Sequence, residues 1–126
     1  MNSKEIDFLL APTLISTDTN YLGVFSRGTL PHPLSHFTCA YVANIDPSSH
    51  TGTHWVAFYY DSTSELEFFD CYGQSPYTYN FPLSRTITSI TFNMYQLQKL
   101  DSKVCGQYCV YYLYQRSRNM RLTDLV

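Results

Sequence analysis

The stretch His54–Asp70, HWVAFYYDSTSELEFFD, decides the fold that this sequence predicts. Its first seven residues are almost entirely apolar, which is typical of a strand inside a sheet rather than at its edge. A short polar turn at 61–64 follows, and residues 65–70 return as the partner strand of a β-hairpin. Because the two strands are antiparallel, His54 and Asp70 are expected near the same end of the hairpin.

Beyond the hairpin, the sequence predicts further strands and two helices. The strands are expected at 20–25, 37–45 and 86–97, and the helices at 2–11 and 105–120. Asn2 and Glu5 have the spacing of a capping box, and Pro12 is expected to stop the first helix. The second helix is apolar on most faces for its first ten residues, which indicates burial. We therefore expect one α+β domain over 1–126, with a central mixed sheet packed on a buried helix and a short N-terminal helix.

Composition excludes several classes of protein. Of the 126 residues 44% are hydrophobic and only 14% are charged, which rules out a disordered chain. A formal net charge of -2 is unlike a strongly basic nucleic-acid binder, so a nucleic-acid partner is only weakly supported. The four cysteines have no disulfide-type spacing, which favours a reducing, intracellular setting. No apolar run is long enough to span a membrane, so no membrane association is expected.

Cys105 is the candidate nucleophile. It opens the second helix after a polar link, and the free N–H groups and positive dipole at a helix N-terminus stabilise a thiolate. Gly106 would let a substrate backbone come close, and Trp55 is a candidate wall of the same cleft. A buried structural cysteine is the alternative interpretation of Cys105, and Cys109 has the character of an ordinary core residue.

A thiol nucleophile needs a base, a group that orients the base, and donors to the oxyanion. His54, at the start of the apolar strand, is the candidate base, and Asp70 the candidate orienting acid. Gln98, seven residues before Cys105, can complete an oxyanion hole with the Cys105 N–H, and Gln96 is a rival for that role. A surface histidine, a turn-starting aspartate and a loop glutamine are the structural alternatives.

A zinc site is a competing interpretation. His50 and His54 are four residues apart, as are Cys105 and Cys109, and two such pairs could make a tetrahedral set. His54 opens a strand whereas His50 lies in a loop, which disfavours the set. We therefore expect no metal in the site.

Four segments together resemble the adenovirus-type cysteine protease (adenain) family, which is related to the SUMO and ubiquitin-like protein proteases. They are YLGVF (21–25), LSHFTCAYVAN (34–44), TGTHWVAFYYDSTSELEFFDCYGQS (51–75) and QLQKLDSKVCGQYCVYYL (96–113). The resemblance implies a papain-like core with the chain order His–Asp–Cys. It assigns the base to His54, the acid to Asp70, the nucleophile to Cys105, and the oxyanion hole to Gln98 and Cys105.

The resemblance also implies a function. Family members are cysteine endopeptidases that process viral capsid and core precursor proteins at glycine-containing sites, in the host nucleus and in the virion. By this likeness the chain is expected to be a monomer that acts on protein substrates of viral or virus-like origin. No cofactor is required by the sequence.

Two departures limit the family's activators. The family's activating peptide is linked through a cysteine, but the corresponding residues 87–89 contain none, and the net charge of -2 weakens the case for DNA.

The chain also ends 21 residues after Cys105, which gives a shortened C-terminus relative to adenovirus enzymes. Deconjugation of a ubiquitin-like protein, acetyl transfer and a catalytically silent binding or scaffold domain stay open as alternatives.

Overall fold

The computed structural model of the protein describes residues 1–32, 34–46, 54–94 and 104–125. Its helices are α1 Ser3–Leu14, α2 Cys105–Arg116 and α3 Leu122–Leu125. Its strands are β1 Asn20–Ser26, β2 Cys39–Asn44, β3 Trp55–Ser62, β4 Glu65–Phe69 and β5 Ser89–Phe92. Two 3-10 turns, η1 Arg27–Thr29 and η2 Pro76–Tyr79, lie in the connections.

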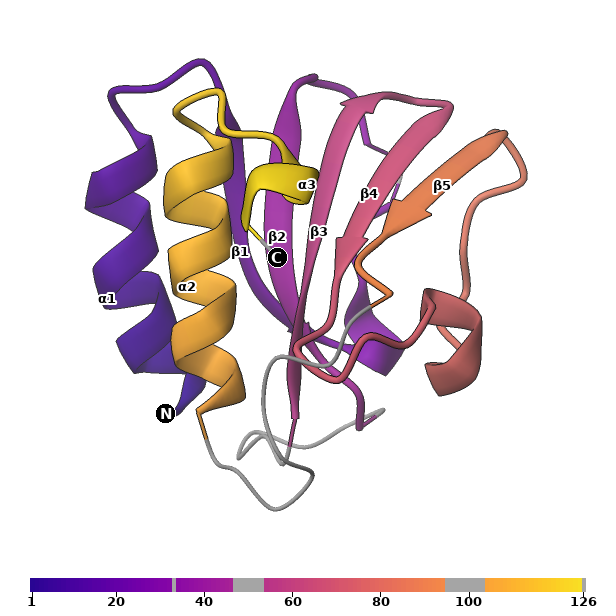
Figure 1. The fold of residues 1–126 in the computed structure, drawn as a ribbon, viewed down its shortest axis with the longest axis horizontal. Coiled ribbons are helices and arrows are strands. Elements are labelled where there is room, and N and C mark those ends of the chain that lie inside the picture. Colours follow the sequence, from indigo (N-terminus) through magenta and orange to yellow (C-terminus); the bar gives the residue numbers. More distant parts are fainter. Residues whose placement is uncertain (33, 47–53, 95–103, 126) are drawn as a thin grey trace.

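The strands form one five-stranded sheet in the order β1-β2-β3-β4-β5 (Figure 1). The two inner pairs, β2–β3 and β3–β4, are antiparallel, and the two outer pairs are parallel. The sheet is therefore mixed, as predicted, and the apolar β3 is its central strand. The predicted hairpin is also confirmed, with Ala57 opposite Phe69 and Ser62 opposite Glu65.

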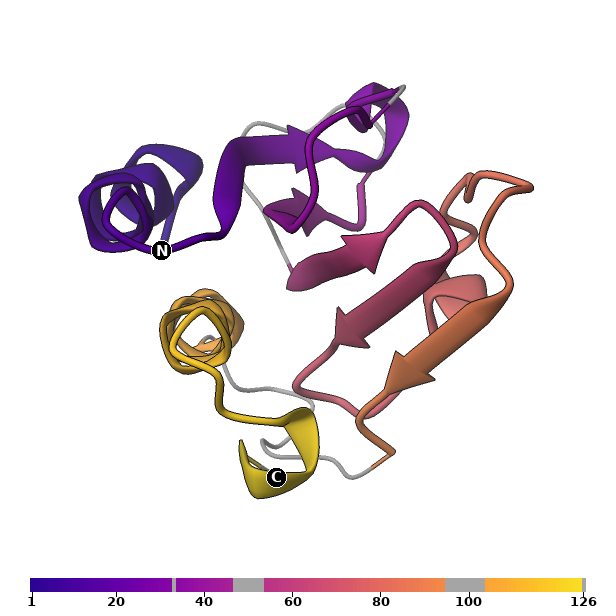
Figure 2. The same ribbon diagram turned by 90° about the horizontal axis from the view of Figure 1, so that it is seen from above.

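The sheet separates two apolar cores. Along β3, Ala57 and Tyr59 pack with α1 and α2, whereas Phe58 and Tyr60 contribute to the core on the opposite face. This alternation is the period of two that a strand imposes on its side chains. Figure 2 shows α1 and α2 on one side of the sheet, and the segments around η1 and η2 on the other. A strand buried on both faces explains why β3 is almost continuously apolar.

The first helix is longer than predicted. The capping box is present as expected, since the Asn2 side chain accepts from the Glu5 N–H and the Glu5 carboxylate accepts from the Asn2 N–H. The prediction that Pro12 ends the helix is wrong, because α1 continues to Leu14. Pro12 lies on the exposed face, where water can solvate the Phe8 carbonyl that loses its partner. The extra turn buries Leu14 against the core.

Other boundaries also differ from the expectation. Of the strand predicted at 86–97, only Ser89–Phe92 pairs with β4, and residues 95–97 lie outside the described residues. The helix predicted to continue to 120 ends at Arg116, and Asn119 adopts a left-handed backbone with φ 69°. The chain then forms α3, which the sequence did not indicate.

Helix α2 buries one face rather than most of its surface. Cys105, Cys109, Tyr112 and Leu113 are buried, whereas the Tyr111 side chain is 49% exposed. Two polar contacts connect the buried face to β4. The Tyr112 hydroxyl donates to Glu67 Oε1, and Arg116 Nε lies 2.9 Å from the same oxygen. These contacts fix the helix that carries Cys105 relative to the sheet.

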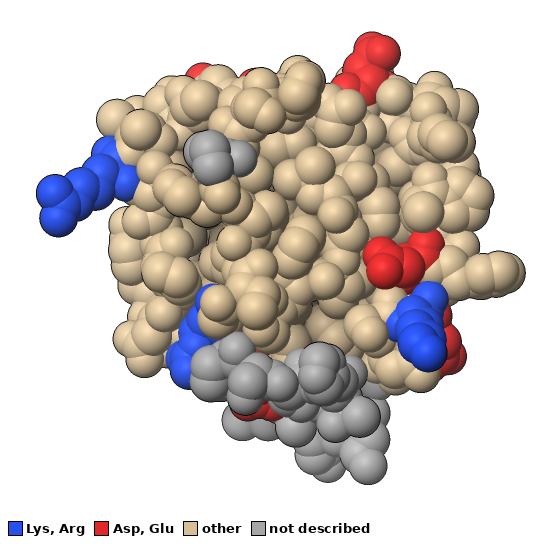
Figure 3. Space-filling view, turned by 180° about the vertical axis from the view of Figure 1, so that it is seen from behind, with Lys and Arg blue, Asp and Glu red and all other residues tan. Residues whose placement is uncertain are grey.

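The face opposite α2 is sparsely charged. On this face, basic side chains are scattered rather than gathered into a patch (Figure 3). A hollow of about 470 Å³ lies at this side of the sheet, with apolar walls that include Leu30, Phe37, Leu83 and Ile87. None of the described helices has the length and apolar character needed to cross a bilayer.

Candidate active site

His54 lies directly before β3 and is only 3% exposed. Because Trp55 pairs with Asn44 at the start of β3, the histidine is held where the sheet begins, and its carbonyl accepts from the Ile45 N–H at 3.2 Å. The imidazole stacks on the Tyr72 ring, with centroids 4.4 Å apart and planes 11° from parallel. Stacking and burial together restrict the ring to one orientation.

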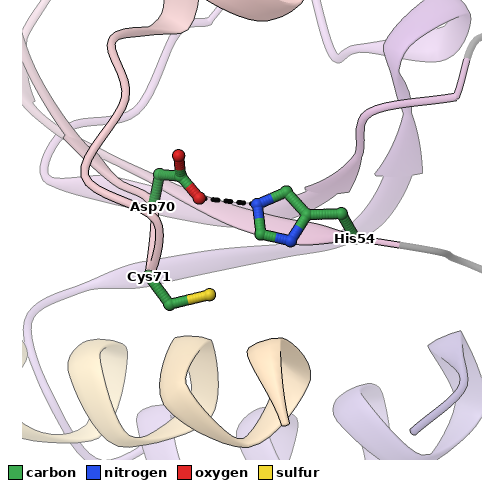
Figure 4. Close-up of side chains that lie close together, drawn as sticks. All are labelled: His54, Asp70 and Cys71. Carbon is green, nitrogen blue, oxygen red and sulfur yellow. Dashed lines mark hydrogen bonds and ion pairs between the residues drawn. The ribbon is translucent and has the colours of Figure 1, made fainter. Parts of the chain in front are cut away.

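Asp70 follows β4 directly and is fully buried. Its Oδ1 lies 2.5 Å from His54 Nε2, which is a buried hydrogen bond between the two candidate catalytic groups (Figure 4). The sequence prediction that the hairpin brings these residues to the same end is therefore confirmed. This contact leaves His54 Nδ1 as the ring nitrogen available to a thiol.

Further donors hold the Asp70 carboxylate in place. The Tyr72 N–H donates to Oδ1 at 3.1 Å, and the Gln74 N–H donates to Oδ2 at 3.0 Å. The Tyr79 hydroxyl donates to Oδ2 at 2.6 Å. Bonds of this kind to an ionised oxygen are the stronger class of hydrogen bond. Donors from the segment 72–79 therefore hold the Asp70 carboxylate in position against His54.

Asn93 supports the same residue from beyond β5. Its Oδ1 accepts from the Asp70 N–H at 3.0 Å, and its Nδ2 donates to the Asp70 carbonyl at 2.5 Å. Asn93 is only 2% exposed. A single amide side chain thus satisfies both backbone groups of Asp70, so it fixes the position from which the carboxylate projects.

Cys105 is the first residue of α2 and is 4% exposed. The Trp55 N–H donates to its sulfur at 3.3 Å, so the nucleophile candidate touches the strand that begins beside His54. His54 Nδ1 is buried and has no hydrogen-bond partner among the described residues, but Cys105 is among the groups that raise the pKa of His54. The structure thus pairs His54 with Asp70 and places Cys105 against the residue that follows His54, and the catalytic roles of the three residues stay a prediction.

These contacts change the acidity of both groups. A hydrogen bond from the Cys71 thiol is the largest influence on Cys105, and with His54 and the Trp55 N–H it outweighs burial and lowers the pKa of Cys105 to about 4. Burial lowers the pKa of His54, but Asp70 and Cys105 prevail and raise that pKa to about 9. Both shifts favour a thiolate on Cys105 and an imidazolium on His54, which is the reactive form of a thiol nucleophile.

The region around Gly106 is tightly packed. A Cβ at this position would lie 3.1 Å from Met1 Cβ and 3.2 Å from Trp55 Cδ1. The Trp55 indole is 2% exposed, and its N–H donates to the Met1 carbonyl at 3.0 Å. The structure thus gives Gly106 a packing role, and the assignment of Trp55 and Gly106 to a substrate cleft stays a prediction.

Several candidates lie outside the described residues. These are Gln98 and its rival Gln96, and also His50 of the competing zinc set. Cys109 belongs to the core between α2 and the sheet. The oxyanion role of Gln98 and Cys105 stays a prediction, although the Val104 side chain does not cap the first N–H groups of α2.

Cys71, Tyr79 and Asn93 lie at the site but were not predicted from the sequence. Each contributes through a contact that its local sequence does not predict. Tyr79 reaches Asp70 across nine positions and Asn93 across 23. Cys71 lies directly after the candidate acid, and that position is the one signal in the sequence that could have identified it.

No protein-family model matches the chain, and no curated protein matches it. Among solved structures, the crystal structure of the ASFV pS273R protease is similar, with 20% identity and a TM-score of 0.49 over 69% of this chain. Its Se-Met form gives 23% identity and a TM-score of 0.48 over the same share. The chain spans 36% and 37% of those two chains. A likeness of this extent carries no function, so the catalytic interpretation has to stand on the contacts of His54, Asp70 and Cys105.

Proposed function

We propose that this chain is a cysteine endopeptidase domain in which His54, Asp70 and Cys105 form the catalytic triad. The observation that carries the proposal is that the candidate acid, base and nucleophile are buried at the same end of the hairpin. Asp70 holds His54 Nε2 at 2.5 Å, and the N–H of Trp55, the residue after His54, donates to the Cys105 sulfur at 3.3 Å. An orienting acid, a base and a nucleophile in that order are the parts that covalent acyl transfer requires.

In the proposed reaction, the Cys105 thiolate attacks the carbonyl carbon of a peptide bond. The carbonyl oxygen becomes an oxyanion, which the N–H of Cys105 and the Gln98 amide stabilise. His54 then gives its proton to the leaving amine, which breaks the C–N bond and leaves a thioester on Cys105. His54 next takes a proton from water, and the hydroxide formed releases the acid and frees the sulfur.

The substrate belongs to the same proposal. By resemblance to the adenovirus-type proteases, we propose protein substrates cut at glycine-containing sites, such as viral or virus-like capsid and core precursors. Action by a monomer in the host nucleus and the virion follows from the same resemblance. A peptide or DNA activator has weaker support, because residues 87–89 lack a cysteine and the net charge is -2.

The test uses an electrophilic peptide probe that ends in glycine, followed by mass spectrometry of the labelled residue. The wild-type chain is expected to be labelled at Cys105, and Cys105→Ala and His54→Ala are expected to lose labelling. Cys39→Ala is the matched control, because Cys39 is also fully buried but lies in the core on the other face of the sheet.

Cleavage of glycine-containing peptides is measured alongside labelling. Ubiquitin-like fusions and acetyl-CoA are included in the same panel, so that deconjugation or acetyl transfer would be detected. A folded wild-type chain that neither labels nor turns over any substrate would contradict the proposal and favour a silent binding domain.

A further inference from the structure

The hollow on the face of the sheet away from α2 has no part in the proposed reaction. Its volume of about 470 Å³ is within the range of about 300–1,000 Å³ that small-molecule sites occupy. The hollow lies between the sheet and two connections, one that follows β1 and one that precedes β5. Leu34 from the first connection and Leu83 from the second are half-buried and contribute apolar walls. The hollow therefore has the size and the lining of a ligand site.

Arg27 supplies the fixed charge of the hollow. Among the described residues that line it, His32 is the other side chain that can become a cation, and none is acidic. Arg27 is half-buried, and its Nη1 donates to the Tyr79 carbonyl at 2.8 Å, which holds the guanidinium at the hollow. A guanidinium has five N–H donors, so this bond leaves donors for an anion. The charge of the lining therefore favours a negatively charged ligand.

Two buried tyrosines add a hydrogen-bond donor to the apolar walls. The hydroxyls of Tyr41 and Tyr60 lie 3.2 Å apart, and both residues line the hollow although they are only 2% and 4% exposed. Burial raises the pKa of both hydroxyls, that of Tyr60 to about 12, so both keep their protons. One hydroxyl donates to the other, which leaves one O–H without an acceptor in the described part of the chain. An oxygen atom of a ligand would satisfy that donor.

We propose that the hollow binds an unbranched alkyl carboxylate, with the carboxylate on Arg27 and the alkyl chain along the apolar walls. Burial of the chain stabilises the complex in proportion to the apolar area that leaves water, and a guanidinium binds a carboxylate through charge-assisted hydrogen bonds. An alkyl chain suits these walls better than a peptide does, because each buried amide group of a peptide would lose its water without gaining a partner. The binding does not depend on the proposed protease function.

The experiment is a calorimetric titration of the full chain with decanoate, below the concentration at which decanoate forms micelles. We expect one decanoate to bind per chain. Decanol has the same alkyl chain without the carboxylate, and it should bind at least about 10-fold more weakly because it loses the charge-assisted hydrogen bonds. Butyrate keeps the carboxylate but buries less alkyl chain, so it should also bind more weakly than decanoate.

Three variants test whether the ligand lies in the hollow. Arg27→Gln removes the charge but keeps a donor for the Tyr79 carbonyl, and it should weaken decanoate binding by about 10-fold or more without changing decanol binding. Arg118→Gln is the matched control, because Arg118 is exposed, lies beyond the end of α2 and does not line the hollow, so this variant should bind decanoate like wild type. Leu83→Trp, which fills the hollow with a larger side chain, should lose binding of both ligands.

The comparison of decanoate with decanol uses wild type alone, so it decides the proposal even if a variant fails to fold. The proposal would be overturned if decanoate showed no saturable binding, if decanol bound as tightly as decanoate, or if wild type and folded Arg27→Gln had equal affinity for decanoate. Tighter binding of a short peptide that ends in leucine would also overturn it, in favour of a protein ligand. None of these results depends on whether the chain cleaves peptides, so the site and the proposed function can fail separately.

Discussion

Asp70 connects the candidate base to the surrounding chain through one carboxylate. His54, two backbone N–H groups and the Tyr79 hydroxyl all donate to it, while Asn93 fixes its backbone. These donors compensate for the burial of the carboxylate and fix its orientation. It can therefore hold the imidazole in one tautomer and stabilise the imidazolium that the mechanism needs.

The substitution Asp70→Asn should lower kcat/KM by about 10²- to 10⁴-fold, because the amide presents a donor or a weaker acceptor to His54 Nε2. Cys105→Ser should lose more, since it removes the nucleophile. Peptide cleavage measures both. Asp61→Asn is the control, because Asp61 is half exposed and its carboxylate lies 3.5 Å from Arg116 Nη2, away from His54. The role assigned to Asp70 would be refuted by equal kcat/KM values for the two aspartate variants.

The three candidate catalytic residues could be identified from the sequence, because each lies at the end of a recognisable element. His54 begins the most apolar strand and Asp70 ends its hairpin partner, so the pairing alone brings them together. The contacts of Tyr79 and Asn93 with Asp70 could not be predicted from the sequence. Their bonds to Asp70 depend on how the chain folds back after β4 and β5, and neither loop carries a periodic pattern from which that path could be predicted.

At the scale of elements, α2 is positioned by polar contacts as well as by its apolar face. Glu67 on β4 accepts from both Tyr112 and Arg116, and the Arg116 guanidinium lies 4.3 Å from the centre of the Tyr59 ring. Burial and the bond to Glu67 raise the pKa of Tyr112 well above its usual value, so the hydroxyl stays a donor. The N-terminus of α2, with Cys105, is thus held against β3.

Tyr112→Phe should lower the free energy of unfolding by about 1–2 kcal/mol, because it removes a buried bond to a carboxylate while Arg116 still pairs with Glu67. Urea denaturation followed by circular dichroism measures it. Tyr111→Phe is the neighbouring control, since the Tyr111 side chain is 49% exposed. Its expected change is within about 0.5 kcal/mol. If Tyr111→Phe lowered the free energy of unfolding as much as Tyr112→Phe does, the contact between Tyr112 and Glu67 would not be what stabilises the fold.

Element types could be predicted better than element ends. The apolar run of β3 and the capping box of α1 are local signals, and both identified their elements. The prediction that Pro12 ends the first helix was wrong because the effect of a proline depends on the exposure of the Phe8 carbonyl. That exposure is determined only by the packed fold. The end of β5 depends on β4 as its partner, and α3 is too short to show a helical period.

At the scale of the molecule, one sheet supports two cores. Phe58 lies at the centre of β3, packs against Tyr41, Phe68 and Phe81, and is fully buried. The opposite face of the same strand supports α2. We therefore expect that a cavity in the core around Phe58 would also disturb the candidate site, which lies on the face of the sheet that packs against α2.

Phe58→Ala should lower the free energy of unfolding by about 3–5 kcal/mol, because it leaves a cavity in a close-packed core. Phe8→Ala is the control, since that ring is 79% exposed and its loss should cost no more than about 0.5 kcal/mol. Urea midpoints of the two variants give the comparison. Similar midpoints would contradict the placement of Phe58 in a shared, tightly packed sheet.

The most direct test of the central claim is the ionisation of Cys105, followed by thiolate absorbance in the ultraviolet as the difference between wild type and Cys105→Ser. The pKa of about 4 predicts that the thiolate signal is already present from pH 5 to 8 and disappears as the pH falls through about 4. In His54→Ala the midpoint should move up in part, and in Cys71→Ala, which removes the largest influence on Cys105, it should move up further. A wild-type midpoint near the ordinary thiol value of about 8.5 would show that no ion pair joins Cys105 to His54, and would contradict the proposed enzyme.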